Sequence, residues 1–430
     1  MVQDIPTQEG PVVNHTNGNC LYAHSGGVSA ALNATAAGAI KAAQRSESIH
    51  DMLVPEYGLH GILNGEFYST KDLDQAALDQ MYCTPSSIFG TSRFKLPDPR
   101  VDQEPYIQIL EVFKTYNIRS LLYHGGGDSQ DTTNKFSQFF KMVDYPIQCI
   151  GLPKTIDNDL MVTDHCPGYG STAKYIATST LEAALDTKAM SRSSTKVFIL
   201  EVMGRNAGWI AAASALARCD ATSAPHLILV PERKKSADNI LAGISLQLDK
   251  EGYCVIVVSE GFQLTDTISS DDSDTCSFGH KRLGGIGLEL ANLIQSSLKV
   301  KTRSANADYL QRAVGHCASA IDLDIAYHIG QRAVQCINDG LYDKMLIVKH
   351  LGYLPLKWKI ETCPIDWVAN HEKHLPDFFI SDNGHDITPA FCEYALSLVQ
   401  GEVKPMRKNS IPAYFSKHHL QKVQIEEHQL

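Results

Sequence analysis

The chain has 430 residues, 43% of them hydrophobic, and is long enough to bury a sizeable core divided between two or three lobes. Its 38 basic and 48 acidic side chains give a net charge of −10, which argues against binding to nucleic acids or to anionic membranes. Apolar runs such as residues 197–200 are far shorter than the roughly 18–20 residues that span a membrane, and the polar N-terminus does not resemble a signal peptide. We therefore expect a globular, cytoplasmic protein whose eleven cysteines are reduced thiols, since no Cys-x-x-Cys pair is present.

Apolar segments alternate with helical segments along the chain. After a polar arm at residues 1–18, which we expect to be mobile, the sequence predicts strands at residues 20–23, 119–123, 147–152, 196–203, 226–231 and 253–259. Helices are predicted at residues 33–44, 172–190, 206–217 and 389–399, and a solvated surface loop is predicted at residues 264–274. Strands that are apolar throughout and separated by helices favour parallel sheets covered on both faces, so the predicted fold class is α/β.

Three glycine turns follow predicted strands, at residues 25–27, 125–129 and 203–205. Glycine lets backbone N–H groups approach a phosphate closely, and ligands of α/β sheets bind where strands end and helices begin. Each turn alone is weak evidence, because a glycine after a strand is more often only a tight turn. The chain has neither the G-x-x-x-x-G-K-[ST] pattern nor a G-x-G-x-x-G turn, so the fingerprints of a P-loop and of a dinucleotide fold are missing.

The most informative segment is residues 151–159, in which an apolar strand leads into Lys154, Thr155, Asp157 and Asp159. Two carboxylates beside a lysine place a possible base, a metal-binding oxygen and a cation in one small volume. The alternative is an Asx-turn that caps the next helix. That alternative does not explain why the strand runs directly into a lysine, a threonine and two acids.

In the order of these motifs, the chain resembles the phosphofructokinase family over roughly residues 18–350. The resemblance rests on residues 25–27 with Asn33, and on residues 89–93, 126–129, 153–159, 168–174, 201–205, 259–261, 278–280 and 309–312. It implies two Rossmann-like lobes with mainly parallel sheets and a C-terminal helical extension. The implied phosphoryl-donor lobe contains residues 19–168 with about 311–375, and the implied sugar-phosphate lobe contains residues 169–310 with about 376–430.

Two positions indicate the phosphoryl donor within that family. ATP-dependent members generally carry glycine where this chain has Asp128 and Lys154, and pyrophosphate-dependent members resemble this chain at both positions. An anionic Asp128 would repel the α-phosphate of a nucleotide, whereas Lys154 can balance the charge of a pyrophosphate leaving group. The resemblance therefore implies transfer from pyrophosphate to the 1-hydroxyl of fructose 6-phosphate, with Mg²⁺ as cofactor.

Three alternatives remain beside this interpretation. The chain could be an ATP-dependent enzyme, or it could act mainly on a seven-carbon sugar phosphate such as sedoheptulose 7-phosphate. A catalytically silent regulatory subunit is the third alternative. It is disfavoured because Lys154, Asp157, Asp159 and Arg205 are all present.

The resemblance also implies roles for individual residues. Asp157 is expected to take the proton from the sugar hydroxyl, and Asp159 to orient the loop or the water shell of the metal. The other residues expected to act in catalysis are Lys154, Asp128 and Arg205. Those expected to bind the donor are Gly27, Gly126 and Arg93. Those expected to contact the sugar phosphate are Thr155, Ile156, Asp157, Met203, Gly204, Arg205, Glu260, Arg303, Tyr309, Leu310, Gln311 and Arg312.

Two further expectations concern the metal and the assembly. Gly127 stands where most family members have an acidic or amide side chain, so Mg²⁺ is assigned to Asp128 and to the backbone of Gly127, together with water and pyrophosphate. Lys196 matches a basic residue that completes the pocket of a neighbouring subunit, so a dimer or tetramer is expected. Residues 371–374 are one residue short of the H-E-x-x-H zinc spacing and are interpreted as a solvated helix face.

Overall fold

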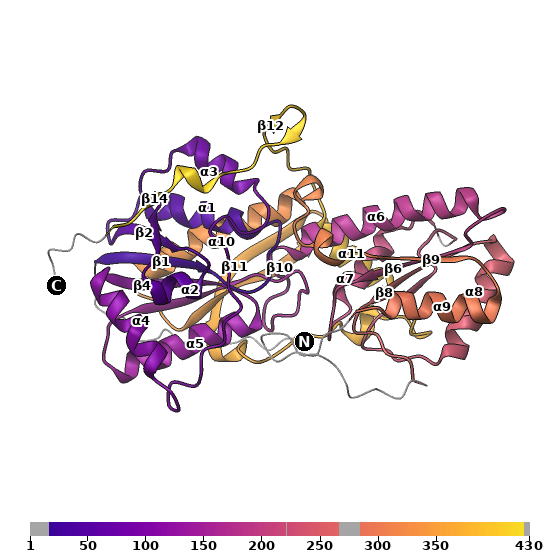
Figure 1. Cartoon of the computed structure of the whole chain (residues 1–430), viewed down its shortest axis with the longest axis horizontal. Coiled ribbons are helices and arrows are strands. Elements are labelled where there is room, and N and C mark those ends of the chain that lie inside the picture. The colour runs from indigo at the N-terminus through magenta and orange to yellow at the C-terminus, as the bar shows by residue number, and fades with distance from the viewer. Residues whose placement is uncertain (1–16, 221, 266–283, 425–430) are drawn as a thin grey trace.

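The computed structural model describes residues 17–220, 222–265 and 284–424, which form two α/β lobes that lie side by side (Figure 1). The predicted N-terminal arm and the predicted loop at residues 264–274 fall almost entirely outside the described residues, and so does the motif at residues 278–280. The two lobes are described separately below, because each has its own sheet and its own core.

The first lobe is built on an eight-stranded sheet with the order β11-β10-β5-β4-β1-β2-β3-β14. The central strands β2, β1, β4, β5 and β10 are parallel, while β3, β11 and β14 pair with their neighbours in antiparallel orientation. The bounds of the strands are β1 Gly18–His24, β2 Ile49–Pro55, β3 Phe67–Ser69, β4 Ile118–Gly125, β5 Gln148–Pro153, β10 Lys344–Tyr353, β11 Leu356–Pro364 and β14 Gln421–Lys422.

Helices cover both faces of this sheet because its strands are apolar on both sides. In β1, Cys20 and Tyr22 belong to one core cluster, while Leu21 and Ala23 belong to another, as the alternation of side chains along a strand requires. The helices on the Tyr22 side are α1 Leu32–Ala43, α3 Gln75–Tyr82 and α10 Ala320–Asn338. Those on the Leu21 side are α2 Leu59–Asn64, α4 Glu104–Thr115 and α5 Gly127–Met142.

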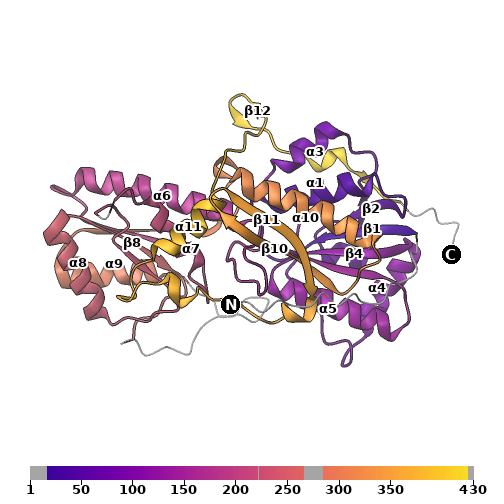
Figure 2. The ribbon, with the colours of Figure 1, turned by 180° about the vertical axis from the view of Figure 1, so that it is seen from behind.

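The second lobe has a four-stranded parallel sheet with the order β7-β8-β6-β9. Its strands are β6 Val197–Val202, β7 Leu227–Leu229, β8 Cys254–Ser259 and β9 Thr302–Asn306. One face packs against α6 Tyr169–Met190, α7 Trp209–Ala213 and α11 Pro389–Leu398, and the other against α8 Ala237–Glu251 and α9 Ile286–Leu298 (Figure 2).

A buried carboxylate joins the lobes where the chain passes from one to the other. Asp322, near the start of α10 in the first lobe, accepts hydrogen bonds from the backbone N–H groups of Gly168 (3.0 Å) and Ser171 (2.9 Å) at the start of α6. The Ser171 hydroxyl donates a third bond to it at 2.6 Å. A carboxylate at a helix N-terminus satisfies N–H groups that have no partner within the helix and suits the helix dipole. This cap ties α6 of the second lobe to α10 of the first.

The α/β class and the predicted strands are confirmed, and the ends of every predicted strand differ from the observed ends by no more than two residues. The predicted helix at residues 206–217 is shorter than expected. It begins at Trp209 and continues from Ser214 as a 3-10 helix. Beyond residue 351 the chain completes the β10–β11 hairpin and contains α11 and the short strands β12 (Arg407–Lys408), β13 (Ile411–Pro412) and β14, so the C-terminal part is less helical than expected.

Within the described part of the chain, no helix is long and apolar enough to cross a membrane. The ten cysteines that the structure describes are free, and most of them are buried in the cores.

Two glycines allow helices α1 and α10 to pack backbone against backbone. A Cβ atom on Gly330 would lie 2.0 Å from the carbonyl oxygen of Thr35, and one on Gly38 would lie 2.0 Å from that of Tyr327. Alanine in place of glycine normally stabilises a helix by about 1 kcal/mol. Here the overlap with backbone atoms reverses the sign, because neither helix can move without disturbing the core beneath it.

We therefore expect Gly330→Ala to lower the free energy of unfolding by about 1–3 kcal/mol, the usual cost of overpacking. The measurement is the thermal unfolding midpoint. Gly352→Ala serves as the control, because a Cβ atom there would meet no atom within 4 Å. An unchanged or higher midpoint for Gly330→Ala would contradict this account of the helix contact.

Candidate active site

The main cavity, of about 1110 Å³, lies where the carboxyl ends of strands from both sheets meet. The first lobe contributes residues that follow β1, β4 and β5, and the second contributes residues that follow β6 and β8 and residues at the end of β9. This is the edge at which parallel α/β sheets usually bind ligands, because backbone N–H groups and helix N-termini are directed there.

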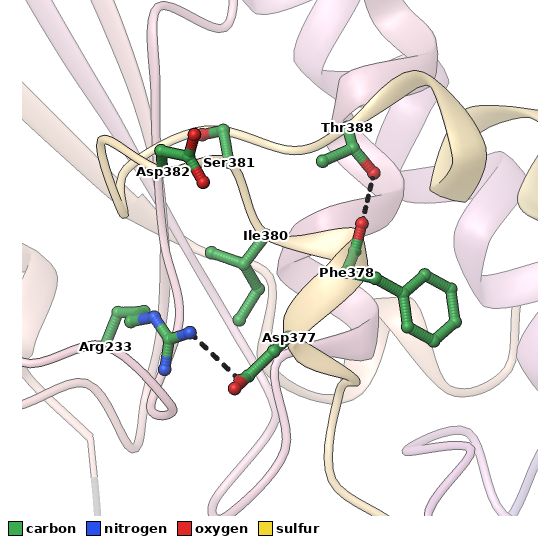
Figure 3. A pocket seen from close by; sticks show the side chains of 7 residues that line it. All are labelled: Arg233, Asp377, Phe378, Ile380, Ser381, Asp382 and Thr388. Carbon is green, nitrogen blue, oxygen red and sulfur yellow. Dashed lines mark hydrogen bonds and ion pairs between the residues drawn. The ribbon is translucent and has the colours of Figure 1, made fainter.

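A second pocket, of about 620 Å³, is lined by residues 377–388 and by Arg233 (Figure 3). Arg233 is paired with Asp377 at 3.0 Å, and the Thr388 hydroxyl donates to the carbonyl oxygen of Phe378 at 2.9 Å. Several of the polar groups drawn in this pocket are thus already bonded, and we assign the candidate site to the larger cavity, where the predicted site residues gather.

At the first-lobe end of the cleft, two glycine turns pack against each other. The Ser129 hydroxyl, in the first turn of α5, donates to the Ser25 hydroxyl at 2.9 Å. A Cβ atom on Gly125 would lie 2.0 Å from the Ser129 oxygen, so a side chain at position 125 would force the turns apart. Gly126 and Gly127 begin α5 and line the cleft, and a Cβ atom on Gly127 would meet nothing within 4 Å. Backbone N–H groups beside open space are suited to hold an anion.

Lys154 lies beneath the first of these turns. Its side chain is only 3% exposed, and its ammonium group donates hydrogen bonds to the carbonyl oxygens of Ser25 (3.1 Å) and Gly27. Burial, followed by the positive charge of Arg312, lowers the pKa of Lys154 to about 7. A bound polyanion would raise this pKa again, so the site is suited to a ligand that brings negative charge.

Asp157 and Asp159 project from the loop that follows β5, and both line the cleft. Burial, followed by the neighbouring charge of Asp159, raises the pKa of Asp157 to about 7, and Glu260 raises it further. Burial also raises the pKa of Asp159, and the next contribution comes from Glu372. Neighbouring carboxyl groups whose pKa values are raised are typical of a site that exchanges protons.

The residue between these acids holds the loop in shape. Asn158 is fully buried and adopts a positive φ of 55°. Its side chain accepts a hydrogen bond from the Cys166 N–H at 2.9 Å and donates one to the Tyr394 hydroxyl at 2.8 Å. The Tyr394 hydroxyl in turn donates to the carbonyl oxygen of Asp164 at 2.9 Å. Tyr394 comes from α11, so the C-terminal part of the chain fixes the conformation of the acidic loop.

The second-lobe wall of the cleft carries the groups expected to bind the sugar phosphate. Met203, Arg205, Glu260, Tyr309 and Arg312 all line it, and the Arg312 guanidinium lies 4.7 Å from the centre of the Tyr309 ring. Arg312 also reaches across to the first lobe, because a Cβ atom on Gly27 would lie 2.7 Å from its Nη2 atom. One guanidinium thus lies within reach of both ends of the cleft.

The structure brings most of the predicted site residues together. Those lining the cleft are Gly27, Arg93, Gly126, Gly127, Asp128, Lys154, Thr155, Ile156, Asp157, Asp159, Met203, Arg205, Glu260, Tyr309 and Arg312. Gly204 and Gln311 lie behind this wall. The backbone of Gly204 accepts a hydrogen bond from Ser259 at 2.5 Å, and the Gln311 side chain accepts one from the Met203 N–H at 3.2 Å.

Besides Gly204 and Gln311, three more predicted residues do not line the cleft of the described chain: Lys196, Arg303 and Leu310. Lys196 immediately precedes β6, and Arg303 is the second residue of β9, so both lie near the amino ends of strands whose carboxyl ends face the cleft. Arg303 is paired in register with Phe198, which places it close to Lys196 on neighbouring strands. Leu310 is 70% exposed.

Other residues line the cleft although the sequence did not identify them. Lys95 is one of them, and its place two residues after Arg93 in the same loop was a usable signal. A further group comes from one segment late in the chain: Asn370, His371, Glu372 and His374. The interpretation of residues 371–374 as a helix face is wrong, because the segment is irregular; His371, Glu372 and His374 are exposed, as expected, but they line the cleft.

A hard divalent cation fits the first-lobe end of this cleft. Asp128 lies in the first turn of α5, and one carboxylate oxygen of Asp159 is buried without a hydrogen-bond partner. Among the described residues there is no group of three or more His, Cys, Asp or Glu side chains that could enclose a metal. Magnesium commonly binds one or two carboxylates together with several waters and substrate phosphates. The few protein oxygen atoms at this end of the cleft are therefore sufficient for it.

Comparison with known proteins places these observations in context. A protein-family model described as Phosphofructokinase matches residues 19–337. The chain is 43% identical over 408 residues to a pyrophosphate–fructose 6-phosphate 1-phosphotransferase from Halomonas elongata, covering 94% of this chain and 97% of that protein. A protein of the same name from Xanthomonas campestris pv. campestris is 43% identical over 405 residues, covering 93% and 96%. The crystal structure of a pyrophosphate-dependent phosphofructokinase from Nitrosospira multiformis has a TM-score of 0.87 and 40% identity, covering 95% of this chain and 98% of that one.

The raised pKa of Asp157 predicts that this carboxylate destabilises the unliganded protein. The free-energy cost accumulates as the pH rises from the ordinary pKa of 3.8 to the folded value of about 7 and stays constant above it. Replacing Asp157 by Asn should therefore raise the thermal unfolding midpoint more at pH 8 than at pH 5. The exposed Asp72→Asn variant is the control and should show no such difference. A midpoint for Asp157→Asn that falls at pH 8 would mean that ion pairing with Lys154 and Arg312 outweighs the cost of burial.

Proposed function

The chain belongs to the phosphofructokinase family, and we propose that it transfers a phosphoryl group from inorganic pyrophosphate to the 1-hydroxyl of fructose 6-phosphate. The products are fructose 1,6-bisphosphate and orthophosphate. The observation that carries the choice of donor is the position of Lys154 beneath the glycine turn, with Asp128 in the first turn of α5 beside it. ATP as the donor is not favoured, because the carboxylate of Asp128 would repel the additional phosphate of a nucleotide.

In the proposed reaction, the oxygen of the sugar 1-hydroxyl attacks the terminal phosphorus of pyrophosphate. The bond between that phosphorus and the bridging oxygen breaks, and orthophosphate leaves with the bonding electrons. Asp157 accepts the hydroxyl proton, a role for which its pKa of about 7 is well matched. Lys154 and Arg312, two cations near the donor turn, counter the negative charge that develops during transfer.

The same proposal assigns Mg²⁺ to the first-lobe end of the cleft, where Asp128, the backbone of Gly127 and the waters bound to them would hold it. When bound, the cation neutralises charge on the pyrophosphate oxygens. Gly26, Gly27 and Gly126 hold the donor with backbone groups, and Arg93 supplies a further positive charge. Asp159 keeps the loop and its water in place beside Asp157.

The acceptor is assigned to the second-lobe wall, where Met203, Arg205, Glu260, Tyr309 and Arg312 surround the open space. Arginine suits the 6-phosphate because its planar guanidinium donates two hydrogen bonds at once. Lys196 and Arg303 lie outside the cleft, so their proposed contact with the 6-phosphate requires a second copy of the chain. We therefore propose a dimer or tetramer, located in the cytoplasm.

The first experiment compares pyrophosphate with ATP as donor by measuring the initial rate of fructose 1,6-bisphosphate formation with Mg²⁺ present. We expect turnover with pyrophosphate alone, and we expect Asp128→Gly to lose this activity or to begin to accept ATP. Removing Mg²⁺ with a chelator should abolish turnover. If ATP is the better donor for the unmodified protein, the roles given to Asp128 and Lys154 are wrong.

The pH dependence of kcat/KM follows from two groups with pKa values of about 7. Asp157 must be ionised and Lys154 protonated, so kcat/KM should rise and then fall with pH around a narrow optimum near 7. Because the charge of Asp159 helps to raise the pKa of Asp157, Asp159→Asn should move the acid limb to lower pH. An acid limb that stays in place in Asp159→Asn would argue against the coupling of these two acids.

Asp157→Ser should lower turnover by at least about 10-fold, with little change in pyrophosphate affinity.

A further inference from the structure

The segment of residues 370–374 enters the cleft although it lies beyond the part of the chain matched by the family model. It follows β11 and a short 3-10 helix, η4 (Ile365–Trp367), and has an irregular backbone. Asn370, His371, Glu372 and His374 line the cavity. The segment also contacts the acidic loop that carries Asp157.

Hydrogen bonds attach the two ends of the segment to different lobes. The Asn370 amide donates to the Asp131 carboxylate of α5 at 2.9 Å. At the other end, the Asn206 amide of the second lobe donates to Glu372 at 2.8 Å, and the His374 ring lies 2.9 Å from the carbonyl oxygen of Asn206. The segment thus spans the cleft from the donor side to the acceptor side, and its middle residue is held in a defined position.

Lys373, which lies between Glu372 and His374, bonds to the loop that carries Asp157. Its backbone N–H donates to the carbonyl oxygen of Asp159 at 2.6 Å. Its ammonium group donates to the carbonyl oxygens of Thr163 (2.9 Å) and Asp164 (3.3 Å). A single residue therefore holds the loop at a point two residues after Asp157 and again at its far end.

The position of Lys373 is itself fixed by Trp209. The Lys373 ammonium lies 5.0 Å from the centre of the Trp209 ring, and the indole N–H donates to the Lys373 carbonyl at 3.0 Å. A cation over an indole face is a stabilising arrangement, more so where water is excluded. Trp209, in the core of the second lobe, therefore fixes Lys373, and Lys373 in turn fixes the loop through its hydrogen bonds.

Lys373 also affects the pKa of an acid in this loop, Asp159. Its positive charge lowers the pKa of Asp159, opposing burial and Glu372, which raise it. The charge of Asp159 in turn helps to raise the pKa of Asp157. The 370–374 segment thus presents both a positive and a negative charge to the residue beside the proposed base.

We propose that Lys373 is a positioning residue for phosphoryl transfer: it holds the loop of residues 155–164 so that Asp157 meets the acceptor hydroxyl. This inference rests on the proposed function, in which Asp157 is the base. Lys373 does not line the cleft and touches neither substrate, so its effect is on the rate of the bound complex and not on substrate affinity. A displacement of a reacting group by about 1 Å can cost about 10²-fold in rate.

The test compares Lys373→Met, Lys373→Arg and Lys349→Met with the unmodified full-length protein. Lys349 is the matched control, because its ammonium also donates to a carbonyl of this loop, that of Val162, at 2.7 Å. Unlike Lys373, it is not among the main charges that shift the pKa of Asp159. We expect Lys373→Met to lower kcat by about 10- to 100-fold. KM for pyrophosphate and for fructose 6-phosphate should stay within about twofold, and Lys373→Arg should recover most of kcat because it keeps the charge and the donors.

Two outcomes would overturn the proposal. One is a loss of kcat in Lys349→Met that equals the loss in Lys373→Met when the two variants have the same unfolding midpoint. Both lysines would then only stabilise the fold. The other is a change confined to KM. If the unmodified protein does not use pyrophosphate, the proposed function fails separately. Amide hydrogen exchange over residues 155–164 still tests Lys373 in that case, and exchange that is no faster in Lys373→Met than in the unmodified protein would refute its positioning role.

Discussion

The active cleft depends on the burial of the Lys154 ammonium beneath the first glycine turn. A buried ammonium is stable only where oxygen atoms replace its lost water, and the carbonyl groups of Ser25 and Gly27 do so here. These bonds join the end of β5 to the end of β1 and fix the shape of the donor turn. The same burial places a titratable cation at the end of the cleft that we assign to the phosphoryl donor. The hydrogen bonds of the Lys154 ammonium therefore determine both the conformation of the turn and the position of a positive charge in the cleft.

Burial shifts the pKa values of the ionisable groups around Lys154 in the unliganded protein. Asp157, Asp159 and Glu260 have raised pKa values because burial penalises their ionisation, and the pKa values of Lys154 and Arg312 are lowered mainly by burial. Such a site is costly to maintain in the unliganded protein. In the proposed reaction, a metal–pyrophosphate complex would bring both signs of charge into this site and offset that cost. Shifted pKa values that cluster in a cleft are typical of functional sites.

The two lobes are connected by residues from distant parts of the chain. Asp322 caps α6, Arg312 reaches from the second lobe to the donor turn, and Tyr394 holds the acidic loop through Asn158. The 370–374 segment adds bonds to both sides of the cleft. The hydrogen bonds of Asp322 and of Asn158 with Tyr394 are buried, and a buried polar group with its partner specifies one arrangement more strictly than apolar packing does. The relative position of donor and acceptor therefore depends on the C-terminal third of the chain as much as on the motif residues.

The sequence by itself determined the α/β class, the glycine turns and the acidic loop, because strand periodicity and turn chemistry are local properties. It also identified the family, since motifs such as that around Asp157 are contiguous. Only the tertiary structure decided which residues share the cleft. It placed Lys95 and residues 370–374 there, and it left Lys196, Arg303 and Leu310 outside among the described residues. The reason is that the cleft is formed by strand ends from two sheets, and their meeting depends on packing between residues hundreds of positions apart, which no local pattern records.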